Sequence, residues 1–233
     1  MKQLKSIFIA GLALPSVAGF ADLATAANRA PTVVELFTSQ GCSSCPPANA
    51  NLIKLSHRED VLTLSFAVTY WDYLGWKDSF GKREFTDRQA DYEPRLRQSG
   101  SYTPQMVVNG TTTTVGNELS EINRLISGAM PLTSPSLSLG KNEVSVGSGP
   151  SPKSEADIWL VRYDPNLVEV PVARGENSGT TLPHIHVVHD LVRLGGWNGQ
   201  PTSHRFAPEP GRLKTAILVQ GDHGGTILSA TTD

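Results

Sequence analysis

The chain has 233 residues, of which 39% are hydrophobic and 18% charged, and its formal net charge is −2. This length and composition suit a globular protein of one large or two ordinary domains with buried cores. The charge is balanced, with neither a basic stripe nor an acidic tail, so we expect no nucleic-acid partner and no strongly basic one.

The N-terminus has the layout of a cleavable secretory signal. Lys2 and Lys5 give a charged start, residues 7–14 form an apolar run, and small residues lead up to Ala26. The apolar run is far shorter than the ~20 residues that a membrane-spanning helix needs. We therefore predict a signal peptide at residues 1–26, cleavage near Ala26, a periplasmic or secreted protein, and no membrane span after cleavage.

Two strands with a helix between them follow the signal. Residues 32–37 are apolar with a β-branched start, residues 48–56 repeat apolar positions at helical spacing, and residues 61–68 are apolar on both faces. This order predicts a βαβ unit with parallel strands and a right-handed crossover.

The rest of the first half alternates helices and short strands. In chain order we predict an irregular aromatic segment at 70–80, a helix at 83–98, a strand after Pro104, a turn at Asn109-Gly110, a return strand at 111–115 and a helix at 119–126. A linker rich in Pro, Ser and Thr follows at 131–135.

The second half consists of short alternating segments separated by turns rich in Gly, Pro and Asn. The segments with strand patterns are 136–139, 143–146, 157–163, 213–219 and 226–229. We therefore predict an α/β domain at residues 30–131 and a mainly antiparallel β domain at residues 132–233.

Cys42 and Cys45 are the only cysteines. They could be a working thiol–disulfide pair, half of a metal site, or an inert staple. A staple across so short a loop stabilises little, because the entropic effect of a disulfide grows with loop length. A structural zinc site needs four ligands, and two cysteines supply only half of them. An exported protein can carry a disulfide, so the working pair is favoured.

The prolines after the cysteines locate the start of a helix. Pro46 and Pro47 lack an N–H and are tolerated only in the first turn, so we expect Ser43 or Ser44 as N-cap, with the second cysteine inside that turn. Cys42 then lies in front of free N–H groups and the helix dipole, which lower a thiol pKa. The sequence thus predicts an exposed attacking thiol at position 42 and a more buried resolving thiol at position 45.

Four stretches of the chain are similar to one bacterial family. They are residues 34–47, 70–78, 102–108 and 174–177. They resemble the exported, thioredoxin-like family catalogued as domain of unknown function 1223, and the resemblance covers essentially the whole mature chain. The order of elements also resembles the thioredoxin fold, a mixed sheet flanked by helices. One stretch departs from the family pattern, because His186-Val-Val-His189 stands where Asn-Val-Val-Arg is usual.

The resemblance implies roles for several residues. Cys42 attacks and Cys45 resolves in a redox-active disulfide. The Thr103–Pro104 peptide is cis and faces the cysteines, so that the Thr103 backbone offers strand-like hydrogen bonds to an extended substrate.

The aromatic segment has two interpretations. It follows the carboxyl end of a central strand, where ligands bind in open α/β sheets, and Cys42 lies on the same edge. Functionally, Trp71, Trp76 and Tyr102 would form a substrate-binding rim, and Asp72 would handle protons. Structurally, the segment would be a small core that packs an insertion against the sheet.

Two further motifs lie in the second half. His184 and His186 could share one strand face as half of a copper or zinc site, although no carboxylate or thiolate constellation accompanies them. Residues 174–177 are either a loop that docks at the cysteines or, more simply, a turn that fixes strand register.

The resulting hypothesis is a thioredoxin-like, monomeric thiol–disulfide oxidoreductase that needs no cofactor beyond its own disulfide. It would exchange disulfides with thiol proteins of the periplasm through a mixed disulfide at Cys42. The alternative is a copper-binding or redox-inert module that uses the same fold as a scaffold.

Overall fold

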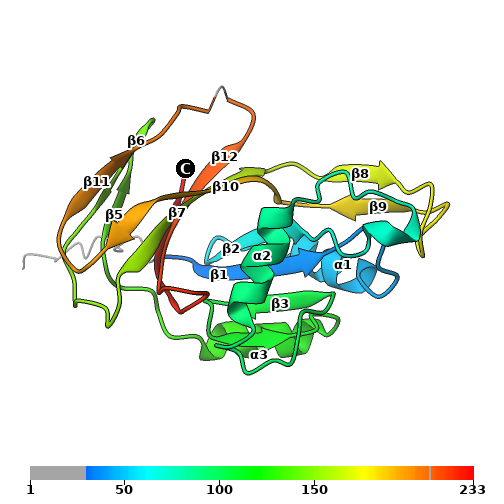
Figure 1. Cartoon of the computed structure of the whole chain (residues 1–233), viewed down its shortest axis with the longest axis horizontal. Helices are drawn as coiled ribbons and strands as arrows, with labels where there is room; N and C mark the ends of the chain where they lie inside the picture. The colour runs from blue at the N-terminus through cyan, green and yellow to red at the C-terminus, as the bar shows by residue number, and fades with distance from the viewer. Residues whose placement is uncertain (1–29, 210) are drawn as a thin grey trace, which may run out of the picture.

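A single mixed sheet of eight strands runs through both halves of the chain (Figure 1). The computed structural model describes residues 30–209 and 211–233, so the predicted signal at residues 1–26 lies outside the described residues. The strand order across the sheet is β13 (Ile227–Thr232), β12 (Lys214–Gln220), β7 (Ala156–Asp164), β10 (Val187–Trp197), β2 (Val61–Ala67), β1 (Thr32–Thr38), β3 (Gln105–Val108) and β4 (Thr112–Thr114).

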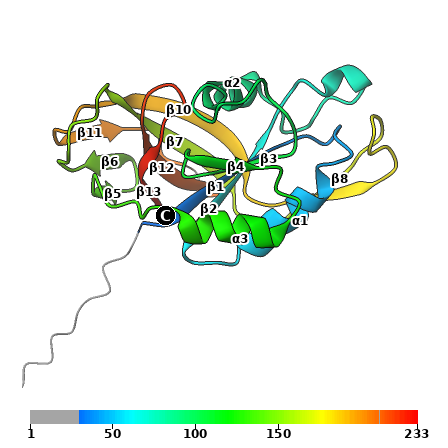
Figure 2. The same ribbon diagram turned by 90° about the horizontal axis from the view of Figure 1, so that it is seen from below.

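The βαβ unit has the predicted form. β1 and β2 are parallel, and α1 (Pro46–Leu55) connects them. Figure 2 shows α1 and α3 (Leu119–Gly128) on one side of the sheet and α2 (Arg83–Tyr92) on the other. β1 is buried on both faces, because Val34 and Leu36 pack in the core with α1 and α3 while Val33 and Phe37 pack with α2. This explains why its sequence is apolar without alternation.

Two local predictions in this half have different outcomes. β3 and β4 form the expected hairpin, and Asn109 and Gly110 at its turn both have positive φ. The helix predicted over 83–98 instead ends at Tyr92. Pro94 explains the difference, because it has no N–H to donate to the Ala90 carbonyl, although Glu93 before it still has helical φ and ψ.

The strands of the second half are mainly antiparallel, as predicted. β10, which the sequence did not reveal, joins this group to the first half through a bridge between Val187 and Ser65. The sheet therefore crosses the predicted domain boundary between residues 131 and 132, and the division into two domains stays a prediction.

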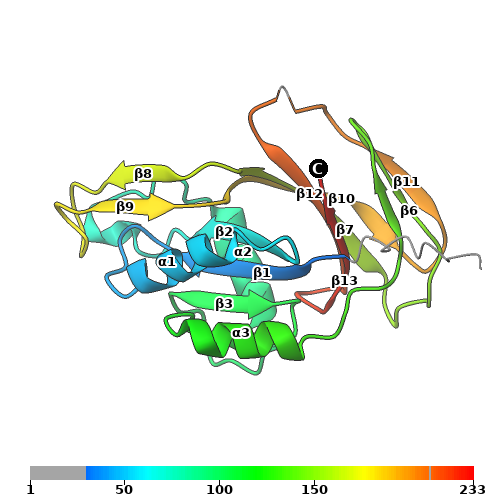
Figure 3. The same ribbon diagram turned by 180° about the vertical axis from the view of Figure 1, so that it is seen from behind.

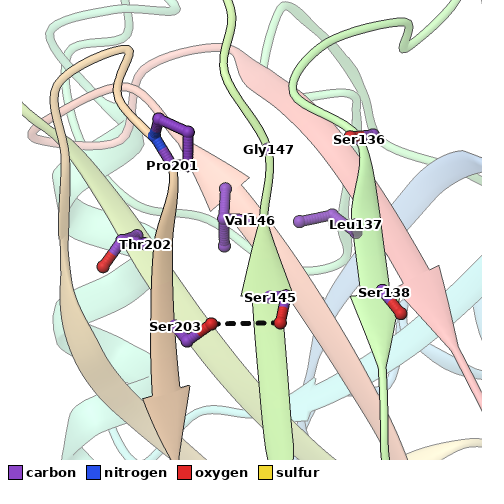
Figure 4. Close-up of a pocket in the computed structure, with 9 residues that line it drawn as sticks. All are labelled: Ser136, Leu137, Ser138, Ser145, Val146, Gly147, Pro201, Thr202 and Ser203. Atoms are coloured by element: carbon purple, nitrogen blue, oxygen red, sulfur yellow. Dashed lines mark hydrogen bonds between the residues drawn. The ribbon is translucent and has the colours of Figure 1, made fainter.

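A smaller sheet covers part of the large one. It consists of β11 (Thr202–Arg205), β6 (Glu143–Val146) and β5 (Leu137–Leu139). Val144 and Val146 pack with Ile158 and Trp197 of the large sheet in a third core. A hollow of about 540 Å³ lies over these strands, where Ser145 and Ser203 share a hydrogen bond of 3.0 Å (Figure 4). No titratable side chain lines this hollow, so it offers no acid–base or redox chemistry.

A two-stranded hairpin extends from the large sheet toward the start of α1. β8 (Val168–Pro171) and β9 (Thr181–His184) pair with each other and form a sheet of their own. The hairpin lies alongside α1 in both Figure 1 and Figure 3. Among residues 30–209 and 211–233, no helix has the length and apolar character needed to cross a bilayer.

A buried ion pair within the first half of the chain is linked to the second half through Tyr92. Arg88 Nε of α2 donates to Glu35 Oε1 of β1 at 2.7 Å, and the two side chains are 5% and 0% exposed. The Tyr92 hydroxyl also donates to Glu35, and Gln220 Nε2 of β12 donates to Tyr92 at 2.9 Å. Burial raises the pKa of Tyr92 well above 10, so the phenol stays protonated and can donate.

We predict that Arg88→Met lowers the free energy of unfolding by about 3–5 kcal/mol, because it leaves the buried Glu35 carboxylate without its charged partner. Urea denaturation measures the loss. Arg83→Met is the control on the same helix, since Arg83 forms only an exposed pair with Asp87 at 3.8 Å; its loss should stay below about 1 kcal/mol. Equal losses in the two variants would contradict this assignment.

Candidate functional site

The two cysteines lie where the loop after β1 enters α1. They form a disulfide with Cα atoms 5.5 Å apart. Cys45 is the N-cap, Pro46 and Pro47 occupy the first two helical positions, and the Asn49 N–H donates to the Cys45 carbonyl at 3.1 Å. The prediction of a serine N-cap is therefore wrong by one or two residues, because the fixed φ and missing N–H of Pro46 suit the first helical position.

Both cysteines are completely buried, with relative exposures of 0%. The prediction of an exposed Cys42 is wrong for this disulfide form. The local features behind that prediction are present, since Cys42 precedes the helix and its neighbours Ser43 and Ser44 are exposed. Cys42 is covered because three segments distant in sequence converge on the loop.

The first covering segment surrounds Pro104. The Thr103–Pro104 peptide is cis, as expected. Ser44 Oγ lies 3.5 Å from the Thr103 carbonyl and 3.3 Å from Cys42 Sγ. Trp71 Nε1 donates to Thr103 Oγ1 at 2.7 Å. These contacts bring Thr103, Pro104 and Trp71 to the cysteine loop.

The second covering segment follows η1 (Asp72–Leu74). Trp76 Nε1 donates to Gln40 Oε1 at 2.8 Å, and the Gln40 N–H donates to Asp78 Oδ2 at 2.7 Å. Asp78 is buried, and desolvation raises its pKa. Asp72 Oδ1 accepts the Asp78 N–H at 3.1 Å and so holds the turn that presents this carboxyl. The carboxyl bonded directly to the cysteine loop is therefore Asp78 rather than Asp72.

The third covering segment comes from the second half of the chain. At the tip of the β8–β9 hairpin, Asn177 Nδ2 donates to the carbonyls of Gln40 and Cys42 at 3.0 and 2.9 Å. Glu176 Oε2 accepts the Ser43 N–H at 2.9 Å and the Ser43 hydroxyl at 2.7 Å. These hydrogen bonds lower the pKa of Glu176.

The stretch 174–177 therefore docks on the cysteine loop and is more than a register turn. Gly175, with a φ of +82°, lies against the loop, since a Cβ built there would stand 3.6 Å from Gly41 Cα and 3.7 Å from Trp76 Cβ. The sequence pointed to this stretch, but not to Asn177 and Glu176 as the contacting side chains.

The chain is similar to one protein family and to two solved structures. The family described as "Protein of unknown function (DUF1223)" matches residues 33–220. The chain belongs to the DUF1223 family. The crystal structure of protein AGR_C_4864 from Agrobacterium tumefaciens is 32% identical, with a TM-score of 0.70, and the match covers 86% of this chain and 92% of that one.

HBP35 of Porphyromonas gingivalis is 15% identical, with a TM-score of 0.55, and the match covers 88% of this chain and 75% of that one. At this identity the likeness concerns the fold alone. No curated protein matches the chain. The family resemblance seen in the sequence motifs is thus confirmed.

Tyr102 of this DUF1223 protein bonds to β4 and α2. Its hydroxyl lies 3.4 Å from Thr113 Oγ1 of β4, and its carbonyl accepts from Gln89 Nε2 at 2.7 Å. Trp71 combines both interpretations of the aromatic segment, because it packs against a core and also bonds to Thr103. Tyr73, which was not among the predicted rim residues, is 78% exposed and stacks on Trp71.

The two histidines do not form a shared site. β9 ends at His184, and His186 has a φ of +50°, so the prediction that they share a strand face is wrong. His184 packs edge-on against Phe80, whereas His186 contacts Tyr163 and Thr63. Among the residues that the structure describes, no cluster of three or more His, Cys, Asp or Glu is arranged to hold a metal.

His184 makes the stability of this DUF1223 protein depend on pH. Burial lowers its pKa from 6.5 to about 4, so the folded protein favours the neutral ring. This contribution is complete above the unfolded-state pKa and is lost as the pH falls from 6.5 toward 4, by about 3 kcal/mol in total.

We predict that His184→Gln, which is neutral throughout, loses about 3 kcal/mol less stability between pH 7 and pH 4 than the wild type does. Chemical denaturation at both pH values gives the two losses. Identical losses in the two proteins would show that His184 is not the titrating group.

Proposed function

We propose that this protein is an exported, thioredoxin-like thiol–disulfide oxidoreductase whose Cys42–Cys45 pair exchanges disulfides with thiol proteins of the periplasm. The observation that carries the proposal is the position of the pair at the N-terminus of α1, with the Thr103–Pro104 peptide held beside it through Ser44. Export rests on the signal-like sequence of residues 1–26.

The surroundings of the pair suit a reactive thiolate. The first turn of a helix offers free N–H groups and the positive end of the dipole, and both stabilise a thiolate at Cys42. Pro46 and Pro47 remove two of those N–H groups, so the pKa depression should be moderate. The Ser44 hydroxyl, 3.3 Å from Cys42 Sγ, can donate a further hydrogen bond to the anion.

The exchange has two steps. In the reductive direction, the Cys42 thiolate attacks one sulfur of a partner disulfide, the partner S–S bond breaks, and the released sulfur leaves as a thiolate that takes up a proton. The Cys45 thiolate then attacks Cys42 Sγ, which expels the second partner thiolate and closes the Cys42–Cys45 disulfide. The partner gains two electrons and the cysteine pair loses two; the reverse sequence oxidises a dithiol.

The burial of both cysteines favours a second candidate, a redox-inert interaction module. In that case the disulfide only shapes the loop. Access to the sulfur distinguishes the two functions, because exchange requires a thiolate to approach along the S–S axis.

We expect the wild type to accelerate the reduction of insulin by dithiothreitol, and Cys42→Ser to abolish this activity, because the attacking sulfur is gone. Cys45→Ser should also lose turnover but retain a one-to-one mixed disulfide with insulin, visible by mass spectrometry under non-reducing conditions. The inert module predicts no mixed disulfide in Cys45→Ser and a Cys42 that alkylates no faster than a free cysteine.

A further inference from the structure

We propose that the tip of the β8–β9 hairpin, residues 173–179, is an autoinhibitory lid over the Cys42–Cys45 disulfide. Asn177 would position the lid on the cysteine loop, and Glu176 would act as a latch, a contact that a partner can replace. Exchange would take place only while this tip is lifted. A regulatory role for this lid rests on the proposed oxidoreductase function. Whether the lid shields the sulfur atoms can be tested even if the protein has no such activity.

The first argument is the accessibility of the sulfurs. Cys42 and Cys45 are both 0% exposed, although Ser43 and Ser44 between them are open to solvent. A loop of this kind at a helix N-terminus is ordinarily a surface feature, because loops run over the outside of a protein. The hairpin tip bonds to three positions here, the carbonyls of Gln40 and Cys42 and the N–H of Ser43.

The second argument is that the tip forms a compact unit of its own. Val172 N–H donates to the Thr180 carbonyl at 2.9 Å, and Gly179 N–H returns a bond to the Val172 carbonyl at 2.8 Å. Ser178 closes the turn through its N–H to Gly175 at 3.2 Å and its hydroxyl to Ala173 at 2.9 Å. The bonds of Ser178 stay within the tip, and those of Val172 join it to the base of the hairpin, so all of them persist if the hairpin moves as a unit.

The third argument is the small amount of packing that lifting would break. β8 and β9 pair only with each other, so no ladder of the eight-stranded sheet is disrupted. Leu182 and His184 are buried and anchor the base of the hairpin. Within residues 173–179 only Asn177 is buried. Lifting the tip therefore breaks mainly four hydrogen bonds, two from Asn177 and two to Glu176.

The two contacts have different parts. Asn177 is buried and satisfies two backbone carbonyls, so it fixes the loop in position. Glu176 is exposed, and its bonds to Ser43 compete with water. A partner that binds the Ser43 N–H with its own carbonyl or carboxylate would replace Glu176 and release the latch. The Thr103 backbone, to which the tip does not bond, would stay available to the same partner.

The test is the rate at which dithiothreitol reduces the disulfide of the folded protein. A dithiothreitol thiolate attacks Cys42 Sγ, the Cys42–Cys45 bond breaks, and Cys45 leaves as a thiolate that is protonated. The second dithiothreitol thiol then attacks the mixed disulfide, which releases reduced Cys42 and cyclic oxidised dithiothreitol. The rate of thiol appearance reports how often the sulfur is accessible.

We expect Glu176→Ala to be reduced about tenfold faster than the wild type, because two hydrogen bonds to a charged acceptor are lost. Glu176→Gln should stay within about threefold of the wild type, since its amide oxygen can still accept from Ser43. Glu169→Ala, which changes an exposed glutamate on β8 of the same hairpin, is the control and should be reduced at the wild-type rate.

Three results would overturn the lid: an unchanged rate in Glu176→Ala, an equal acceleration in Glu176→Gln, which would mean that only the negative charge repels the reductant, or an equal acceleration in Glu169→Ala. Asn177→Ala gives an independent check and should also be reduced faster.

The insulin assay separates the two proposals. If Glu176→Ala is reduced faster but neither it nor the wild type reduces insulin, the lid stands and the oxidoreductase proposal fails. If the wild type reduces insulin and Glu176→Ala reacts no faster, the lid fails and the oxidoreductase proposal stands.

Discussion

The bond between the Ser65 N–H of β2 and the His186 carbonyl, 2.9 Å long, determines how the two halves of the chain meet. It joins the antiparallel strands of the second half to the edge of the βαβ unit and makes one sheet of both. The chain that precedes this junction forms the β8–β9 hairpin beside α1 (Figures 1 and 3), and at the tip of the hairpin Asn177 and Glu176 bond to the cysteine loop.

This arrangement combines two opposing demands on the disulfide. The N-terminus of α1 and the Ser44 hydroxyl favour a thiolate, whereas both cysteines are buried in a loop that the hairpin tip and the segment after β2 contact. Reactivity and access are thus set by different parts of the sequence. A second half that only widened the sheet would not need a buried amide aimed at the Gln40 and Cys42 carbonyls, and this is why we assign the hairpin a role in exchange.

Local physics made much of the first half predictable. β1 and β2 could be recognised from continuous apolar runs, the β3–β4 turn from Asn109-Gly110, and the helix start from Pro46 and Pro47. β10 was missed because its pattern is irregular: it contains two register shifts, charged residues and the pair Gly195-Gly196. The burial of Cys42 could not be predicted, because the segments that contact its loop are distant in sequence; Asn177, which bonds to the Cys42 carbonyl, lies 135 residues further along the chain. Such long-range pairing leaves no periodic signal in the sequence.

The most direct test of the central claim, that Cys42 and Cys45 form a working redox pair, is the reduction potential of their disulfide, measured by equilibration with defined ratios of reduced and oxidised dithiothreitol or glutathione. A working pair predicts a value between about −270 and −120 mV, the range of exchange proteins. A value below about −300 mV, typical of structural disulfides, would contradict the account.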